Sequence, residues 1–123
     1  MNEFAEKMKR RTKMIGVSVI KLVDSLPKKA VSFKVIDQIV GCSTSIGANY
    51  RAACRAKSDA DFINKLKIVE EETDETLYWL EVLNESDLIP VEKTRDLYKE
   101  VNEILSVVVA SINTSKSKST KYK

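Results

Sequence analysis

Apolar residues recur along this chain every three or four positions, in four stretches that short polar segments separate. This spacing places the apolar side chains on one face of an α-helix, so the pattern predicts helices and not strands. The longest regular stretch has seven positions in alternating steps of four and three: Phe62, Leu66, Val69, Thr73, Thr76, Leu80 and Leu83. The predicted helices cover residues 3–25, 32–55, 58–86 and 90–115.

Several residues mark where these helices begin and end. Pro27 ends the first helix, because proline lacks the amide hydrogen that a helix interior needs. Ser32 is the predicted N-cap of the second helix, and Ser58, followed three residues later by Asp61, caps the third. Pro90 suits the first turn of the fourth. Because short connections join helices of similar length, we predict an all-α fold, an antiparallel up-down-up-down four-helix bundle.

The second helix contains an unusual number of small residues. Its apolar face includes Ser43, with Gly41, Cys42, Gly47 and Ala48 beside it. Each glycine inside a helix costs about 1 kcal/mol relative to alanine, so a packing reason is expected. Small residues let two helix backbones approach closely. We therefore expect this stretch to face the larger side chains of the third helix, which follows it antiparallel.

The length of 123 residues suits one domain. We place the bundle at residues 1–115 and predict a disordered basic tail at 116–123, where polar and basic residues alternate and nothing can be buried. The chain has a net charge of +3, but residues 114–123 hold four lysines and no acid, which leaves 17 basic against 18 acidic residues elsewhere. The body is near-neutral with local basic clusters, unlike a uniformly basic nucleic-acid binder.

The composition also bounds the cellular setting and the chemistry. No apolar run approaches the ~18 residues that span a bilayer, and the charged N-terminus lacks a signal-peptide pattern, so we expect a cytoplasmic protein without a membrane partner. The chain has no histidine, which excludes Ser-His and Cys-His nucleophile pairs and the Glu-x-x-His di-iron pattern. There is no glycine-rich phosphate loop either. We expect a protein that is not an enzyme and has no cofactor.

Two other groups of residues receive a structural interpretation first. Cys42 and Cys54 lie twelve positions apart on one predicted helix, roughly 18 Å, which is too far for a disulfide. Five acids between Glu70 and Glu75 spread around the third helix. A solvated face explains them better than a metal site or a protein-binding surface, so we expect no metal.

Basic residues form the candidate nucleic-acid site. Arg51 and Arg55 lie four residues apart and share one face of the second helix. Such a pair can bind phosphates, and an oligomer would repeat the pair around a ring. In the alternative interpretation, Arg55 and Lys57 pair with Asp59, Asp61 or the acidic run. The candidate nucleic-acid-binding residues are Arg10, Arg11, Arg51, Arg55, Lys57 and Lys65.

Aromatic and surplus apolar residues suggest an oligomer interface. Tyr78 and Trp79 flank the apolar face of the third helix, so one of them points away from the protomer core and suits an interface. Tyr50 lies on the apolar face of the second helix and is expected in the core. The first and fourth helices carry more apolar residues than a lone four-helix protomer needs to cover: Val17, Ile20, Leu105, Val107 and Val109.

Several short segments in order resemble a known family. They are Ser45-Ile46-Gly47-Ala48-Asn49, Arg55-Ala56-Lys57-Ser58, Asp61-Phe62 and Glu75-Thr76-Leu77-Tyr78-Trp79-Leu80. With these, the stretch from Gln38 to Leu83 resembles the bacterial four helix bundle protein family, first noticed in intervening sequences of large-subunit ribosomal RNA and often labelled ribosomal-protein-like. Many members read S-I-P-x-N-I-A-E-G in the second helix, where this chain has Gly47 and Ala48 and then Tyr50-Arg51-Ala52-Ala53.

The resemblance implies a homo-oligomer, since members of the family look like homo-pentamers of four-helix protomers. A related protein is the accessory protein of diversity-generating retroelements, whose basic pentamer binds nucleic acid and a reverse transcriptase. We therefore expect a homo-oligomeric, non-enzymatic accessory protein associated with RNA or DNA. The alternative is a structural or adaptor oligomer that binds a protein partner through the acidic and aromatic surface of its third helix.

Overall fold

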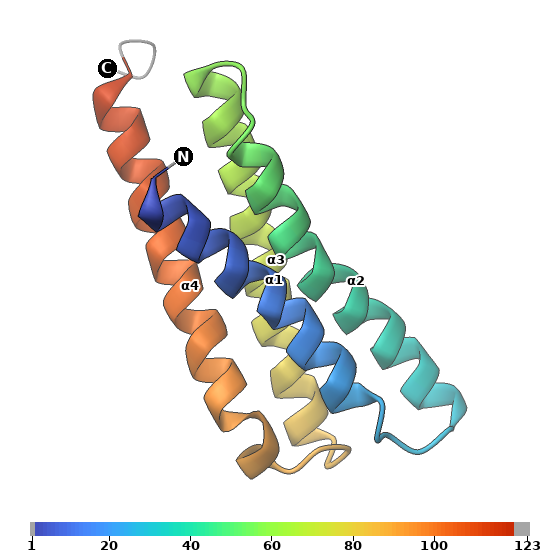
Figure 1. The fold of residues 1–123 in the computed structure, drawn as a ribbon. Coiled ribbons are helices and arrows are strands. Elements are labelled where there is room, and N and C mark those ends of the chain that lie inside the picture. Colours follow the sequence, from blue (N-terminus) through green and yellow to red (C-terminus); the bar gives the residue numbers. More distant parts are fainter. Residues whose placement is uncertain (1, 120–123) are drawn as a thin grey trace.

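The structure, a computed structural model, describes residues 2–119 and contains four helices and no strand in that range. They are α1 (Glu3–Val23), α2 (Ala30–Ala53), α3 (Asp59–Glu85) and α4 (Val91–Lys118). Figure 1 shows the four helices lying side by side as a bundle. The predicted all-α fold is confirmed.

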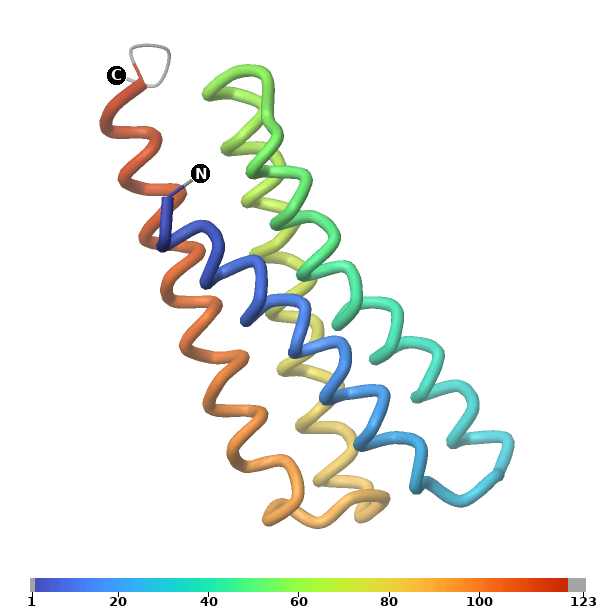
Figure 2. Tube along the Cα trace, viewed as in Figure 1, coloured from blue at the N-terminus to red at the C-terminus, as the bar shows by residue number. Residues whose placement is uncertain are grey.

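Each helix packs against the helix that follows it, and α4 returns to lie beside α1 with fewer close approaches. The chain trace in Figure 2 places the α1–α2 and α3–α4 connections at one end of the bundle and the α2–α3 turn at the other. Neighbouring helices therefore run in opposite directions. Among residues 2–119, no helix is both long and apolar enough to cross a lipid bilayer.

The core follows the predicted apolar spacing. Six of the seven predicted positions of α3 are buried, while Phe62 is half-buried and its neighbour Ile63 is fully buried in its place. Threonines at core positions keep their hydroxyls satisfied within their own helix, since Thr73 donates to the Val69 carbonyl over 2.6 Å and Thr12 donates to the Met8 carbonyl over 2.8 Å. These two buried hydroxyls therefore carry no penalty for an unmade hydrogen bond.

Gly47 of α2 faces α1, so the prediction that the small stretch of this helix faces α3 was wrong for this residue. A Cβ atom added to Gly47 would lie 3.0 Å from the backbone N and Cα of Lys13. In α1, a Cβ added to Gly16 would lie 3.1 Å from Cγ2 of Thr44. These two glycines, one from each helix, bring the α1 and α2 backbones together. Gly41 has nothing within 4 Å of such an atom and faces open space.

The face of α2 that meets α3 carries Cys42. Its sulfur lies 3.3 Å from the Thr76 hydroxyl oxygen, and both residues are buried. The predicted antiparallel register placed Ser43 near Val69 to Glu71, so this contact lies about one helical turn further along α3. Burial raises the pKa of the Cys42 thiol to about 11, which keeps it protonated and unreactive in the folded protein.

Four predicted helix ends are corrected. Helix α1 ends at Val23 and α2 ends at Ala53, each two residues before its predicted end. Helix α2 begins at Ala30, with Lys29 at the N-cap and no side-chain cap, so Ser32 lies inside the helix. Helix α4 continues to Lys118, three residues beyond the predicted end, and Lys116 and Lys118 in its last turn favour this because cations stabilise a helix C-terminus. Residues 116–118 are thus helical where disorder was predicted, and Ser119 is the C-cap of α4. The last four residues of the predicted tail, 120–123, lie outside the described residues.

The other predicted caps lie at or beside the observed helix ends. Ser58 is the N-cap of α3 and accepts a hydrogen bond from the Asp61 amide over 3.0 Å. Pro90 is the N-cap of α4, one position before the first turn. In the connection before it, the Asn84 side chain donates to the Ile89 carbonyl over 3.0 Å, and Asp87 has a positive φ of 62°.

Candidate functional site

A groove of about 520 Å³ runs along the contact between α1 and α2. Its charged residues are Glu6, Lys9, Arg10, Lys13 and Arg51. The remaining lining consists of small or aliphatic residues: Gly16, Val17, Ile20, Thr44, Gly47 and Ala48. We call this surface the α1–α2 groove.

The helical spacing of α1 explains why these residues share one surface. Arg10, Lys13, Val17 and Ile20 follow one another in steps of three, four and three, which places them along one face of the helix. Most α2 residues that line the groove have small side chains, which project little into it, and Gly47 lets the Lys13 backbone approach to van der Waals contact. The floor of the groove is therefore backbone and small side chains, with the basic side chains gathered around one part of it.

The α1–α2 groove is strongly positive. It holds four cationic side chains and one carboxylate, a net charge of +3. Lys9 forms an ion pair with Glu6 over 2.8 Å, and this hydrogen bond lowers the pKa of the Glu6 carboxyl. Arg10, Lys13 and Arg51 form no ion pair with any carboxylate in residues 2–119. Three cations are thus available to an anionic partner.

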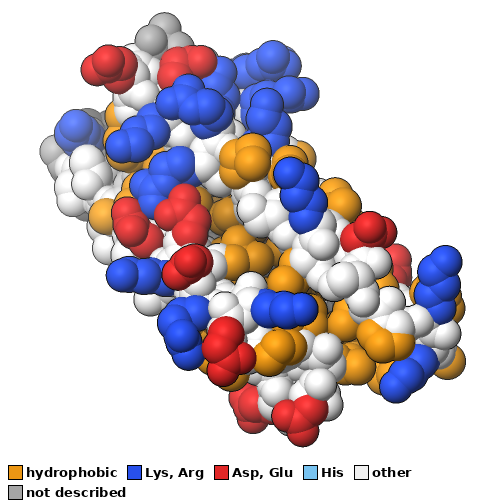
Figure 3. All heavy atoms as spheres, turned by 60° about the horizontal axis from the view of Figure 1, so that its bottom comes forward, with side chains coloured by type: hydrophobic (Ala, Val, Ile, Leu, Met, Phe, Trp, Pro, Cys, Tyr) orange, Lys and Arg blue, Asp and Glu red, His pale blue; other side chains and the backbone are white. Residues whose placement is uncertain are grey.

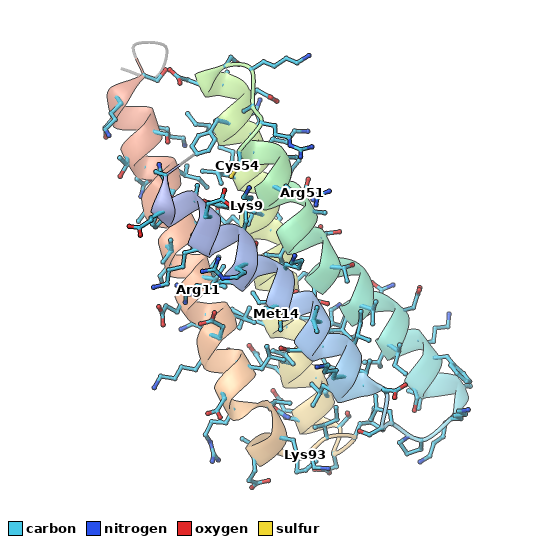
Figure 4. The ribbon with its side chains drawn as sticks, viewed as in Figure 1. Lys9, Arg11, Met14, Arg51, Cys54 and Lys93 are labelled. Carbon is cyan, nitrogen blue, oxygen red and sulfur yellow. The ribbon has the colours of Figure 1, made fainter. Side chains whose placement is uncertain are left out.

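Of the six predicted nucleic-acid-binding residues, Arg10 and Arg51 line the groove together, although they come from different helices. Figure 4 shows Lys9 and Arg51 near the α1–α2 contact, whereas Arg11 lies on the other side of α1, over α4. Lys9 and Lys13, absent from the predicted set, also line the groove.

Arg11 was predicted to bind nucleic acid, but it forms an ion pair that joins α1 to α4. Its Nε and Nη2 donate to the two oxygens of Glu100 over 2.9 and 2.8 Å, and Nη2 also donates to Glu103 over 3.0 Å. These bonds raise the pKa of Arg11 and lower the pKa of Glu100. With its fork-shaped guanidinium held by two carboxylates, Arg11 is not free for a phosphate.

The other three predicted residues lie outside the groove. Arg55 and Lys57 are exposed at the α2–α3 turn, and Lys65 is half-buried on α3. The predicted alternative, in which Arg55 and Lys57 pair with nearby acids, is not observed as side-chain ion pairs within the described range. The Lys57 backbone amide does donate to Asp61, over 3.4 Å. Lys57 borders a second hollow of about 540 Å³ at this end of the bundle.

The two predicted interface aromatics differ in exposure, as expected for neighbouring positions on a helix. Tyr78 is 56% exposed, and Trp79 is half-buried against the core. Their rings meet edge to face, with centroids 5.2 Å apart. Tyr50 is buried in the core, and burial raises the pKa of its hydroxyl to about 12. Within residues 2–119, no three acidic, cysteine or histidine side chains gather closely enough to hold a metal ion.

Comparison with known proteins places the chain in a family. The sequence model of the 23S rRNA-intervening sequence protein family matches residues 6–110. The chain belongs to this family. The resemblance found in the sequence is therefore confirmed, and the match extends over all of α2 and α3 and most of α1 and α4.

A solved relative supports the same assignment. It is a Bacteroides thetaiotaomicron protein of the S23 ribosomal protein family, described as having unknown function. The two chains are 35% identical, and the similarity covers 89% of this chain and 97% of the other with a TM-score of 0.82. No protein with a curated description matches this chain.

Proposed function

We propose that this member of the 23S rRNA-intervening sequence protein family is a non-enzymatic accessory protein that binds nucleic acid through the α1–α2 groove. The observation that carries the proposal is the group of three unpaired cations in one groove, from two helices.

Such a groove would bind the phosphate backbone with little preference for base sequence. Contacts between cationic side chains and phosphates position a nucleic acid, whereas sequence is read through base edges. Each phosphate that a cation neutralises releases counterions, so binding weakens steeply as salt rises. Up to four cations per groove predict a slope of log affinity against log salt of about −3 for a single strand.

The test is a titration of labelled RNA and DNA oligonucleotides at several salt concentrations, followed by fluorescence anisotropy. Arg51→Ala and Arg10→Ala should each weaken binding several-fold and make the salt slope shallower by about 0.7. Lys93→Ala is the matched control, since it removes the same charge from exposed α4, outside the groove. Undetectable binding at ~50 mM salt, or equal effects of Arg51→Ala and Lys93→Ala, would overturn the proposal.

We also propose that the protein acts as a cytoplasmic homo-oligomer, with a pentamer expected from the family resemblance. Outside the groove, large hydrophobic side chains remain exposed on α1 and α2, which supports association: Phe4, Met14, Val31 and Phe33. An oligomer would repeat the groove and raise the apparent affinity for a long strand. Light scattering of the purified protein measures the subunit number, and a monomeric mass would contradict this part.

A second candidate function is an adaptor that binds a protein through α3. Exposed Tyr78 favours it, because Tyr78 borders a hollow that Glu81, Val82 and Glu85 also line. Aromatic residues of this kind are enriched at protein interfaces. Co-purification with a protein that Tyr78→Ala releases, together with no salt-sensitive binding of nucleic acid, would favour the adaptor over the first proposal.

A further inference from the structure

The α1–α2 groove changes character along its length. Lys9, Arg10, Lys13 and Arg51 surround one part, while Gly16, Val17 and Ile20 line the part further along α1. Ile20 is 48% exposed, and it lies beside half-buried Val17 in this part of the groove. On the face drawn in Figure 3, hydrophobic side chains gather near the middle and toward one end, with both basic and acidic side chains around them.

This mixture distinguishes between two forms of nucleic acid. A duplex presents phosphates and sugars on its outside and keeps the faces of its bases stacked inside, so an apolar groove wall beside the phosphates gains nothing from it. A single strand has unstacked bases, and their apolar faces can cover exposed aliphatic side chains while the backbone follows the cations. Charge alone does not explain why Val17 and Ile20 continue the line of Arg10 and Lys13.

We propose that the α1–α2 groove is a binding site for single-stranded RNA or DNA, with phosphates at Arg10, Lys13 and Arg51 and bases against Val17 and Ile20. This inference rests on the proposed function and names the substrate class of the same site. Glu6, which also lines the groove, repels phosphate, but its ion pair with Lys9 offsets that charge locally. The close α1–α2 approach at Gly16 and Gly47 forms the floor of the groove, and the open volume above it is about 520 Å³.

The experiment compares a single-stranded oligonucleotide with a hairpin duplex of the same number of phosphates, at one salt concentration. The single strand should bind at least about five-fold more tightly. Ile20→Asn should weaken the single strand about three- to ten-fold, as expected for losing half of an isoleucine's burial, and leave duplex binding and the salt slope unchanged. Ile20→Phe should strengthen single-strand binding, because an aromatic ring stacks on bases.

Two controls distinguish a lost base contact from a change in folding or assembly. Val91→Asn changes an aliphatic residue of α4 with 49% exposure, nearly the same as Ile20, and should have no effect on binding. Circular dichroism and light scattering should show the same helix content and mass for Ile20→Asn as for the unmodified protein. A changed mass would place Ile20 in a subunit interface and overturn the inference.

The remaining outcomes separate the two proposals. If the duplex binds as tightly as the single strand, or polyglutamate competes as well as RNA at equal charge, the groove responds to charge alone and this inference is wrong while the proposed function stands. If neither form binds at ~50 mM salt, the proposed function itself fails.

Discussion

The contact between α1 and α2 can be tested with two glycines of the same helix. Gly41 and Gly47 both lie inside α2, so replacing either by alanine brings the same gain in helix propensity, about 1 kcal/mol. They differ in surroundings, because a Cβ at position 41 meets nothing within 4 Å, whereas one at position 47 lies 3.0 Å from two backbone atoms of Lys13. The difference between the two variants isolates the helix contact.

The expected magnitudes follow from these distances. Gly41→Ala should raise the free energy of unfolding by about 0.5–1 kcal/mol. Gly47→Ala forces the α1 backbone to move, and overpacking of this kind costs about 1–3 kcal/mol, which exceeds the propensity gain. We expect a net loss of about 1 kcal/mol, and a gap of about 2 kcal/mol between the variants.

Urea unfolding followed by circular dichroism, at one protein concentration, measures both variants. Thermal unfolding gives a second measurement. In a domain of this size each kcal/mol corresponds to a shift of about 4 °C in Tm, so Gly41→Ala should melt about 8 °C above Gly47→Ala. If Gly47→Ala is as stable as Gly41→Ala, α1 and α2 do not approach closely at this point. The description of the groove floor as backbone and small side chains would then be wrong as well.

Three other predictions concern single side chains. Arg11→Ala should destabilise the protein by about 1 kcal/mol, because its partly buried bonds to Glu100 and Glu103 join α1 to α4. The pKa of Glu100 is lowered in the folded state, so this stabilisation is present above about pH 4.3 and is lost as the pH falls through the folded-state pKa. The variant and the unmodified protein should therefore be equally stable at about pH 2. An undiminished difference at that pH would contradict the assigned ion pair. At pH 8 a thiol reagent should modify half-buried Cys54 before buried Cys42, as mass spectrometry after timed quenching can measure, and a Cys42 that reacts first would contradict its packing against Thr76. Asp87→Gly should raise Tm by a few degrees, because glycine adopts the φ of 62° without strain, and an unchanged or lower Tm would argue against that turn geometry.

The sequence predicted the helices and the core face well for a physical reason. Burial in a bundle requires apolar side chains at the helical period, so Leu66, Val69 and Leu80 could be placed from spacing alone. The same reasoning could not choose the neighbour of Gly47, because a small residue permits close approach by any helix. The register and rotation of α1 against α2 decide that contact, and no local pattern records them.

The candidate site illustrates the same limit. Arg10 and Arg11 are adjacent in the sequence, yet about 100° of helix rotation sends one into the groove and the other to Glu100, 89 residues away. Lys9 and Lys13 belong to the same basic run, but their part in the groove depends on where α2 places Arg51. Tyr78 and Trp79 differ in exposure for the same reason.

The most direct test of the proposed site is photo-crosslinking of a single-stranded RNA that carries photoreactive bases, followed by mass spectrometry of the crosslinked peptides. We expect crosslinks in α1 from residue 9 to residue 20 and in α2 from residue 44 to residue 51, and their loss in the Arg10→Ala, Arg51→Ala double variant. Crosslinks concentrated on α3 or α4, or an unchanged pattern in the double variant, would contradict the proposed site.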